Sequence, residues 1–216
     1  GDVKFDHLPV MLAEVLEVFE EIEDGLIADA TIGGAGHARA LLEQAPARQL
    51  LGIDRDPSAV KVSRGRLAEF GQKAQVVQGR FDEIGQILDL DGRQLNGALF
   101  DLGVSSHQLD TPGRGFSHRY AAPLDMRMNP DDALEAATIV NSYGEQELTD
   151  LLRTNSDERF AYRIAKSIMA ARPIESTQEL ADIVRSAVPA AARRKRRHPA
   201  MRTFQAIRIA VNNELA

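Results

Sequence analysis

The sequence predicts an α/β fold, in which a parallel sheet with helices on both faces is followed by an inserted helical domain. Two observations predict the sheet. Short apolar segments alternate with amphipathic helical segments over residues 1–110, and a glycine-rich turn joins the first apolar segment to the next helix. A third observation predicts the helical domain: after residue 110 the pattern changes, and a loop rich in proline is followed by consecutive helical segments. The chain has no cysteine, which excludes disulfides and thiolate metal sites.

The first half of the chain alternates predicted helices and strands. An apolar stripe predicts an amphipathic helix over residues 10–23. Asp56 and Pro57 supply an N-cap and a first-turn proline for a helix that continues to about residue 70. The remaining expected elements are a helix over 37–44 and strands over 26–30, 50–53, 75–77 and 98–100.

The second half predicts a long ordered loop and then helices. The loop covers residues 111–130, which contain three prolines and two glycines without a clear period. Four helical segments are expected to begin near residues 144, 156, 176 and 203, with Asp157 and Glu158 in the first turn of the second and a capping box from Ser176 to Glu179 in the third. We therefore divide the chain into the first part of the core (1–110), the loop with the helical insertion (111–200) and a helix that returns to the core (201–216).

Charge is distributed unevenly along the chain, whose formal net charge is −6. Residues 1–110 carry 10 basic and 19 acidic side chains, and residues 111–216 carry 16 and 13. A polyanion would therefore bind the second half. The basic run proposed for this contact, with a solvated linker as the alternative, consists of Arg193, Arg194, Lys195, Arg196 and Arg197.

Nothing in the sequence points to a membrane. The longest apolar runs are far shorter than a membrane span, and the polar first residues do not resemble a signal peptide. A cytoplasmic location is therefore expected. No pair of histidines has the spacing of a helical metal site, so we expect no metal.

The strongest motif joins a glycine-rich turn to an acidic residue at the end of the next strand. Residues 29–37 read Asp-Ala-Thr-Ile-Gly-Gly-Ala-Gly-His, and Asp54 lies 20 residues beyond Gly34. N–H groups at a helix N-terminus bind anionic groups, and an acid at this spacing binds a ribose hydroxyl in doubly wound sheets. The alternative is that the glycines only form a tight turn and Asp54 caps the next helix. The candidate ligand contacts are Gly33, Gly34, Ala35, Gly36, His37 and Asp54.

This motif favours S-adenosylmethionine over a dinucleotide. A dinucleotide fingerprint needs a third glycine at position 39, where the sequence has Arg39. S-adenosylmethionine has no pyrophosphate, and it presents a small carboxylate to the turn and a ribose to the acid. Because methylation of cytosine at C5 normally needs a cysteine nucleophile, a methyl transfer by this chain must go directly to an amine or a hydroxyl.

Two residues that follow later strands extend the candidate site. Phe81 follows the third strand and packs either on an adenine ring or in the core. Asp101 follows the fourth strand, and its carboxylate either faces the same crevice or caps a turn. No catalytic residue is assigned, but Asp101, Ser105 and Ser106 are candidates for the oxygen that accepts a hydrogen bond from a target amine.

Ordered segments along nearly the whole chain carry a family resemblance. They are residues 34–37, 53–56, 101–106, 108–110, 114–117, 123–128, 158–161, 198–200 and 202–208. Together they resemble the bacterial 16S ribosomal RNA cytosine-N4 methyltransferases, the RsmH or MraW family. The members of this family continue beyond the position of Ala216.

The resemblance implies a Rossmann-like class I methyltransferase core with an inserted helical domain that helps to bind RNA. It implies methylation of the N4 amine of one cytidine in the decoding region of the small-subunit RNA. A complete sheet of this class has seven strands, so the C-terminal strands of the core are expected to be missing from residues 1–216. The S-adenosylmethionine contacts that the resemblance implies are Ala35, Gly36, His37, Asp54, Phe81, Asp101 and Gln108.

The expected partner is therefore 16S ribosomal RNA or the small ribosomal subunit, with the run from Arg193 to Arg197 as the predicted RNA contact. A homodimer is left open. Two alternatives remain. One is a nicotinamide-dependent oxidoreductase, which shares the strand, glycine turn, helix and acid. The other is an RNA-binding module without catalytic activity.

Overall fold

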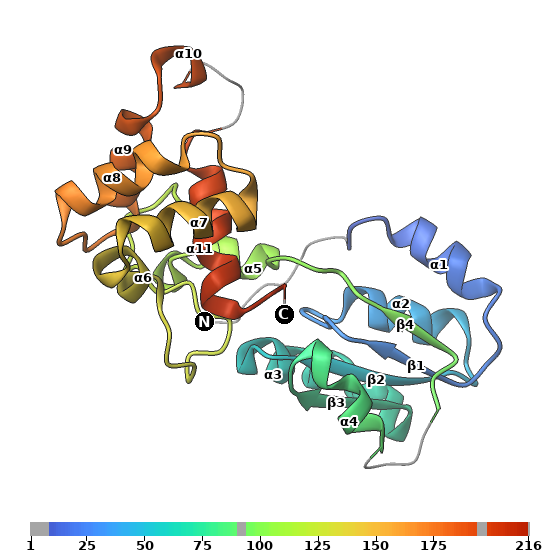
Figure 1. The fold of residues 1–216 in the computed structure, drawn as a ribbon. Helices are drawn as coiled ribbons and strands as arrows, with labels where there is room; N and C mark the ends of the chain where they lie inside the picture. The colour runs from blue at the N-terminus through green and yellow to red at the C-terminus, as the bar shows by residue number, and fades with distance from the viewer. Residues whose placement is uncertain (1–8, 90–93, 194–197, 216) are drawn as a thin grey trace. The chain divides into compact units, whose positions relative to one another are not determined.

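The protein, described as a computed structural model over residues 9–89, 94–193 and 198–215, consists of two compact units. Unit 1 comprises residues 1–105 and contains the sheet, and unit 2 comprises residues 106–216 and is helical (Figure 1). No helix in the described ranges is long and apolar enough to cross a membrane.

Unit 1 is built on a four-stranded sheet in which all neighbouring strands are parallel, in the order β3-β2-β1-β4. Parallel pairing brings the carboxyl ends of all four strands to one edge. The prediction of four parallel strands is confirmed, with ends that differ from the predicted ones by at most one residue. The strands are β1 (Leu26–Asp29), β2 (Gln49–Asp54), β3 (Ala74–Gln78) and β4 (Gly97–Leu99).

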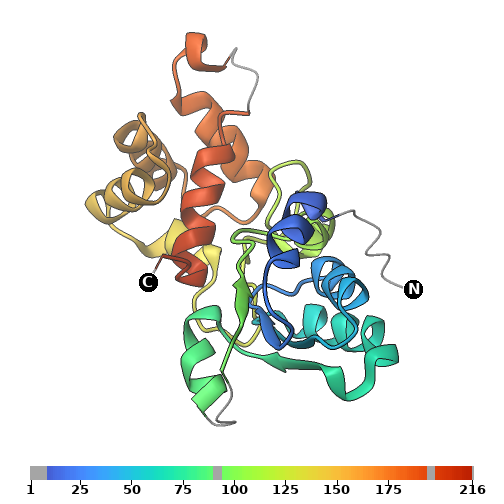
Figure 2. The ribbon, with the colours of Figure 1, turned by 90° about the vertical axis from the view of Figure 1, so that its right-hand side faces the viewer.

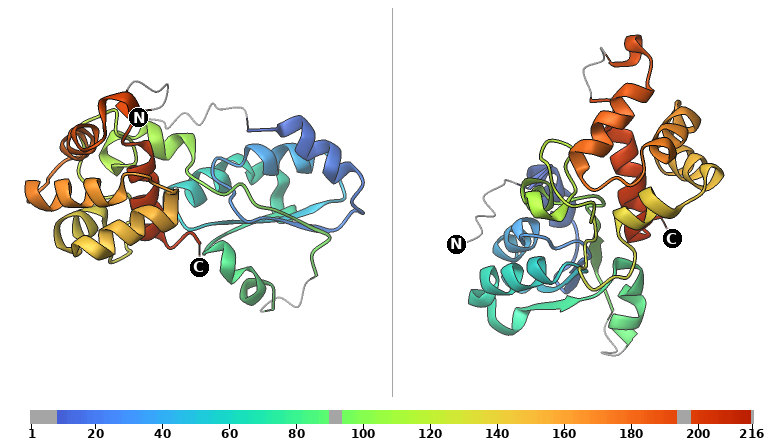
Figure 3. Two further views of the ribbon diagram at one scale, coloured as in Figure 1. Left: turned by 45° about the horizontal axis from the view of Figure 1, so that its top comes forward. Right: turned by 90° about the vertical axis from the view of Figure 1, so that its left-hand side faces the viewer.

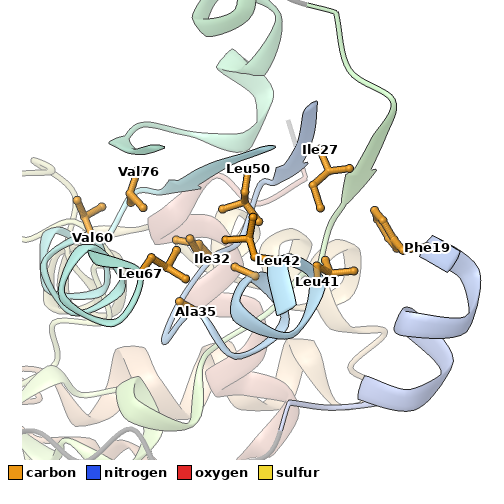
Figure 4. Close-up of a cluster of buried hydrophobic side chains, with 11 residues drawn as sticks. Phe19, Ile27, Ile32, Ala35, Leu41, Leu42, Leu50, Val60, Leu67 and Val76 are labelled. Atoms are coloured by element: carbon orange, nitrogen blue, oxygen red, sulfur yellow. The ribbon is translucent and has the colours of Figure 1, made fainter. Parts of the chain in front are cut away.

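Helices cover both faces of this sheet (Figure 3). Successive side chains of a strand point to opposite faces. Accordingly, Leu50 of β2 joins the apolar cluster on one face, which Figure 4 shows, whereas Leu51 and Ile53 join the cluster on the other. The first cluster contains side chains of α1 (Leu12–Glu20), α2 (Gly36–Gln44) and α3 (Pro57–Arg66), and the second contains side chains of α4 (Ile84–Asp89).

Two helices of unit 1 are shorter than predicted. The first begins at Leu12 because Met11 takes left-handed backbone angles, φ 53° and ψ 37°. The third ends at Arg66 and is followed by a separate 3₁₀ segment, η1 (Ala68–Lys73). Gly71 within that segment has φ 56°, which stops a regular helix from continuing to the next strand.

Arg48 is a buried cation that joins the C-terminal ends of α1 and α2. Its side chain donates from Nη2 to Phe19 O (2.8 Å) and from Nη1 to Leu41 O (3.2 Å) and Gln44 Oε1 (3.1 Å). Carbonyl groups in the last turn of a helix lack intrahelical partners and carry the negative end of the helix dipole. The guanidinium, only 2% exposed, therefore adds a charged donor to carbonyl groups in the last turns of both helices.

Unit 2 is a set of packed helices. Within it α11 packs on α7 and α6, α7 on α8, and α8 on α9 (Figure 2). The return of residues 201–216 to the sheet stays a prediction. The helices are α5 (Ser106–Asp110), α6 (Ala136–Ser142), α7 (Glu145–Ser156), α8 (Ala161–Ala171), α9 (Thr177–Ala187), α10 (Ala190–Arg193) and α11 (Met201–Asn212), with a 3₁₀ turn η3 (Pro112–Arg114) in the loop.

The sequence misplaced one helix start in unit 2 and did not predict the short helices α5, α6 and α10. The helix expected to begin near Ser156 begins at Ala161, because α7 continues to Ser156 and ends at Asp157 in left-handed conformation. The seven-residue helix α6 is too short to show a period in the sequence. The capping bond predicted for the next helix is present, with Ser176 Oγ accepting from Glu179 N.

Asn212 holds the long loop against α11. It is fully buried, accepts a hydrogen bond from Met128 N (2.7 Å) and donates to Met126 O (2.7 Å). Between these two methionines, Arg127 makes two parallel hydrogen bonds to the Asp125 carboxylate, at 2.8 and 2.9 Å. These contacts explain how a segment without regular structure keeps one conformation.

Replacing Arg48 by Met should lower the free energy of unfolding by about 2–3 kcal/mol, because buried carbonyl groups on two helices lose a charged hydrogen-bond donor. Urea titration followed by circular dichroism measures the change. Lys73→Met is the control, because Lys73 donates to Pro46 O at an exposed site and its loss should change the free energy by less than about 0.5 kcal/mol. Equal midpoints for the two variants would contradict this account of Arg48.

Candidate functional site

The glycine turn leads from β1 into α2 at the carboxyl edge of the sheet. Gly33 and Ala35 both take left-handed angles, φ 48° and φ 62°. Glycine does so freely, whereas alanine pays about 1 kcal/mol for this conformation. The turn ends at Gly36, where α2 begins, and the first N–H groups of a helix have no partner within it. The chain thus presents main-chain donors at this edge.

Side chains from elsewhere in unit 1 hold this turn. Arg66 donates to Gly34 O at 2.9 Å. A Cβ atom at Gly36 would lie 2.4 Å from Pro9 Cγ, so only glycine fits there. His37 is buried, and its Nε2 lies 2.9 Å from Val10 O, to which it donates. The imidazole therefore faces residues 9 and 10, and any ligand contact by His37 would use its main-chain N–H.

Asp54 ends β2 and bonds directly to the turn. Its Oδ2 accepts from Gly33 N and its Oδ1 from Asp56 N, both at 2.9 Å. Burial raises the pKa of the Asp54 carboxyl, and these N–H donors partly offset that rise. A carboxylate can accept about four hydrogen bonds, so the main-chain N–H groups of Gly33, Arg55 and Asp56 leave about one site for a ligand. The cap of α3 is Asp56, which accepts from Ser58 N, so Asp54 supports the turn and not that helix.

Asp29 belongs to this group, although we did not assign it a role from the sequence. It ends β1 with only 3% of its surface exposed. Burial raises the pKa of the Asp29 carboxyl to about 7; the Thr31 N–H lowers it in part, and the nearby charges of Asp54 and Asp101 raise it further. The available signal was a carboxylate that ends an otherwise apolar strand.

Thr31 ties the end of β1 to the segment after β4. The Asp101 N–H donates to Thr31 Oγ1 at 2.7 Å, and the Thr31 side chain also bonds the Asp29 carboxyl. β4 ends at Leu99, two residues before Asp101, and the Asp101 side chain is exposed. The main chain of Asp101 is therefore fixed, while its carboxylate stays open to solvent.

Phe81 begins the 3₁₀ turn η2 (Phe81–Glu83) after β3 and lies against Phe100. The two ring centroids are 6.3 Å apart with an interplanar angle of 89°, an edge-to-face pair. Phe81 is partly buried, and Phe100 is 46% exposed. Phe100 was not among the predicted residues, and its only signal is its position next to Asp101.

The remaining candidates follow β4 in the sequence. Gln108 is buried in α5, within unit 2. Ser105 is partly buried, and the side chain of Ser106 lies outside what the structure describes. Arg193 ends α10 and donates to Val188 O and Ser186 O, while residues 194–197 lie outside the described ranges.

Three carboxylates thus gather at the ends of three neighbouring strands. Asp54 follows β2, Asp29 follows β1 and Asp101 follows β4, and the charges of the other two act on Asp29. A pyrophosphate would meet like charge at this edge, whereas a ligand carrying positive charge would be stabilised. The edge therefore favours a cationic ligand that also offers hydroxyls and a small anionic group to the turn.

The parallel sheet, the glycine turn before α2 and the acid that ends β2 define a Rossmann-like α/β protein. The chain matches the profile of the MraW methylase family over residues 4–216, and it belongs to this family. The family match supports the methyltransferase prediction and not the oxidoreductase alternative.

Curated relatives agree over almost the whole chain. The chain is 47% identical over 219 residues to a protein of Heliobacterium mobile named ribosomal RNA small subunit methyltransferase H. The aligned region covers 99% of this chain and 70% of that protein. It is 51% identical over 216 residues to the protein of the same name in Geobacter sulfurreducens, covering 98% of this chain and 70% of that protein.

Replacing Asp29 by Asn should change how stability depends on pH. The folded-state pKa of Asp29, about 7, lies above the ordinary value of 3.8 for an aspartate. Its protonated form therefore stabilises the fold fully below pH 3.8, and this contribution is lost as the pH rises to about 7. Relative to Asp29→Asn, the wild type should lose roughly 2 kcal/mol of unfolding free energy between pH 5 and 7 and then stay level.

Urea titrations at pH 5, 6, 7 and 8 measure this difference. Asp24→Asn, at an exposed position, is the control for the loss of one carboxyl. A difference between wild type and Asp29→Asn that stays constant from pH 5 to 7 would show that Asp29 is not held in its protonated form by burial.

Proposed function

We propose that this chain transfers a methyl group from S-adenosylmethionine to the N4 amine of a cytidine in small-subunit ribosomal RNA. The main observation that supports this proposal is the hydrogen bond from Gly33 N to Asp54 Oδ2. It places the main-chain N–H donors of the turn beside the carboxylate that ends β2. The RNA target is supported by the printed names of the relatives, ribosomal RNA small subunit methyltransferase H.

The residues at the edge fit S-adenosylmethionine. We assign the carboxylate of its methionine part to main-chain N–H groups at Ala35, Gly36 and His37, and a ribose hydroxyl to Asp54. Its positive charge suits the carboxylates of Asp29 and Asp101. Further proposed contacts are Gly33, Gly34, Phe81 for the adenine ring, and Gln108 of unit 2.

S-adenosylmethionine, when bound, supplies an electrophilic methyl group. The N4 lone pair would form the new bond to the methyl carbon while the carbon–sulfur bond breaks. The electrons of the broken bond would pass to sulfur, and N4 would release one proton. The chain's main contribution is to hold the two reactants in line. An oxygen that accepts a hydrogen bond from the N4 amine keeps the N4 lone pair from delocalising into the ring. We assign this acceptor role to the exposed Asp101 carboxylate, with Ser105 and Ser106 as the other candidates.

The target base must leave its stack to reach the methyl group, so the substrate is an unpaired or everted cytidine. We assign RNA binding to residues 111–200, including the basic run from Arg193 to Arg197. Charge reversal in that run should reduce the salt dependence of RNA binding.

Replacing Asp54 by Ala should weaken the binding of S-adenosylhomocysteine by about 10- to 100-fold, because the ribose loses a charged acceptor and the Gly33 N–H loses its partner. Isothermal titration calorimetry measures the affinity. Asp24→Ala is the matched control, because Asp24 is exposed between α1 and β1 and its loss should not affect the affinity. An unchanged affinity for Asp54→Ala would refute the ribose assignment.

Wild-type protein should transfer tritium-labelled methyl from S-adenosylmethionine to small-subunit ribosomal RNA, and nucleoside mass spectrometry should identify N4-methylcytidine. Titration with NADH should show no saturable binding. RNA binding without any methyl transfer would support the non-catalytic module instead. Label found on another nucleoside would overturn the N4 assignment while leaving the methyl donor in place.

A further inference from the structure

The exposed face of α8 carries positive charge that folding does not explain. The opposite face of the helix buries Ala161, Ile164, Ala165 and Ile168. At about 100° per residue, Tyr162, Arg163, Lys166 and Met169 fall within about 120° of the helix surface, and all four are exposed. Arg159, two residues before the helix, is exposed as well.

The cations on this face have no acidic partner in the part of the chain that the structure describes. Among the described residues, no ion pair involves Arg159, Arg163 or Lys166, and residues 159–171 contain no Asp or Glu. The nearest preceding acid, Glu158, is buried, and its Oε1 accepts from Phe160 N. The positive charge of the face is therefore uncompensated within these residues.

Helix electrostatics run against this arrangement. Acidic side chains stabilise the first turn of a helix and basic ones the last. The two neighbouring helices obey this rule. α7 has Glu145 and Glu147 in its first turn and Arg153 in its last turn. α9 has Glu179 in its first turn and Arg185 in its last turn. α8 has no acid in its first turn and no base in its last, and Arg163 lies in the first turn. Within the helix, Arg163 also has a like charge three residues after it, Lys166, and this spacing of like charges destabilises a helix.

Tyr162 adds an aromatic ring to this face. It is 49% exposed, and it lies four residues before Lys166 and next to Arg163. Exposed aromatic rings among cations are what proteins use to stack unpaired bases while the cations bind the phosphates. A folded RNA with unpaired nucleotides fits this combination better than an acidic protein surface does.

A second element extends the charge. Arg202, in the first turn of α11, donates from Nη1 to the main-chain oxygen of Asp157 at 2.7 Å. That oxygen lies two residues before Arg159, so the start of α11 is fixed beside the start of α8. Arg202 is exposed, and this bond to a neutral carbonyl leaves its charge in place.

We propose that the exposed face of α8, formed by Arg159, Tyr162, Arg163 and Lys166 and extended by Arg202, binds the RNA substrate. The cations contact phosphates, and the Tyr162 ring stacks on an unpaired base. The assignment rests on the proposed function, and the residues that it names are other than those of the basic run at 193–197.

The triple variant Arg159→Gln, Arg163→Gln and Lys166→Gln tests the phosphate contacts. Fluorescence anisotropy with a cytidine-containing fragment of small-subunit ribosomal RNA gives the binding constant over a series of salt concentrations. The slope of log K against log salt should fall in magnitude by about 2, since each phosphate contact contributes about 0.7–0.9. The control triple variant Arg39→Gln, Lys61→Gln and Lys73→Gln makes the same change in net charge at exposed positions of unit 1 and should keep the wild-type slope.

Tyr162 is tested separately. Tyr162→Ala should weaken binding of a single-stranded fragment about tenfold, and Tyr162→Phe should keep it, because the ring and not the hydroxyl stacks on the base. Both variants and the α8 triple variant should bind S-adenosylhomocysteine as wild type does. The triple variant should unfold at the same or a higher temperature, since it removes repulsion along the helix.

The outcomes separate the two proposals. If wild type binds S-adenosylhomocysteine but no RNA, the RNA target fails and the α8 assignment fails with it. If wild type binds RNA and the α8 triple variant keeps the full salt slope, only the α8 assignment fails. A slope that falls equally in the control variant would also overturn it, because net charge alone would then explain the effect.

Discussion

The hydrogen bond from Gly33 N to the Asp54 carboxylate is the constraint on which the site depends. A left-handed turn leaves its main-chain donors without partners unless another segment supplies an acceptor. Here the neighbouring strand supplies it, and Ile32 N also donates to Ile53 O. On the other side, Ala30 N donates to Leu99 O and Asp101 N to Thr31 Oγ1. Three strands are thus joined beyond their ladders, so the sheet register sets where the donors and the carboxylates lie.

The sequence pattern predicted those parts of the site that consist of consecutive residues. Apolar runs gave the strands, and the glycines with the acid 20 residues on gave the turn and Asp54, because each is written in consecutive residues. The roles of Asp29 and Thr31 depend on burial and on contacts across strands, which spacing does not reveal. The start of α8 was misplaced for a related reason. Asp157 looks like a first-turn acid, but a short polar side chain also suits the left-handed residue that ends α7.

The charge patterns of the two units answer different chemical needs. In unit 1 the carboxylates of Asp29, Asp54 and Asp101 suit a cationic methyl donor, and the same charges repel the phosphates of a nucleic acid. An RNA methyltransferase needs both ligands, so the phosphates must be bound by other residues. The cation-only face of α8, in unit 2, has the opposite sign and an exposed aromatic ring. The excess of acidic over basic residues in the whole chain is therefore no argument against an RNA substrate.

α8 also shows why such a face persists in a stable fold. Like charges at helical spacing and a cation in the first turn each destabilise a helix by a few tenths of a kcal/mol. Ile164 and Ile168 on the opposite side are completely buried, and each fully buried side chain of this size contributes about 1.5–3 kcal/mol. Packing therefore outweighs the unfavourable electrostatics several times over. Because the inward face alone secures the helix, the outward face is free to carry side chains chosen for a ligand, and unfavourable charge there is evidence for function.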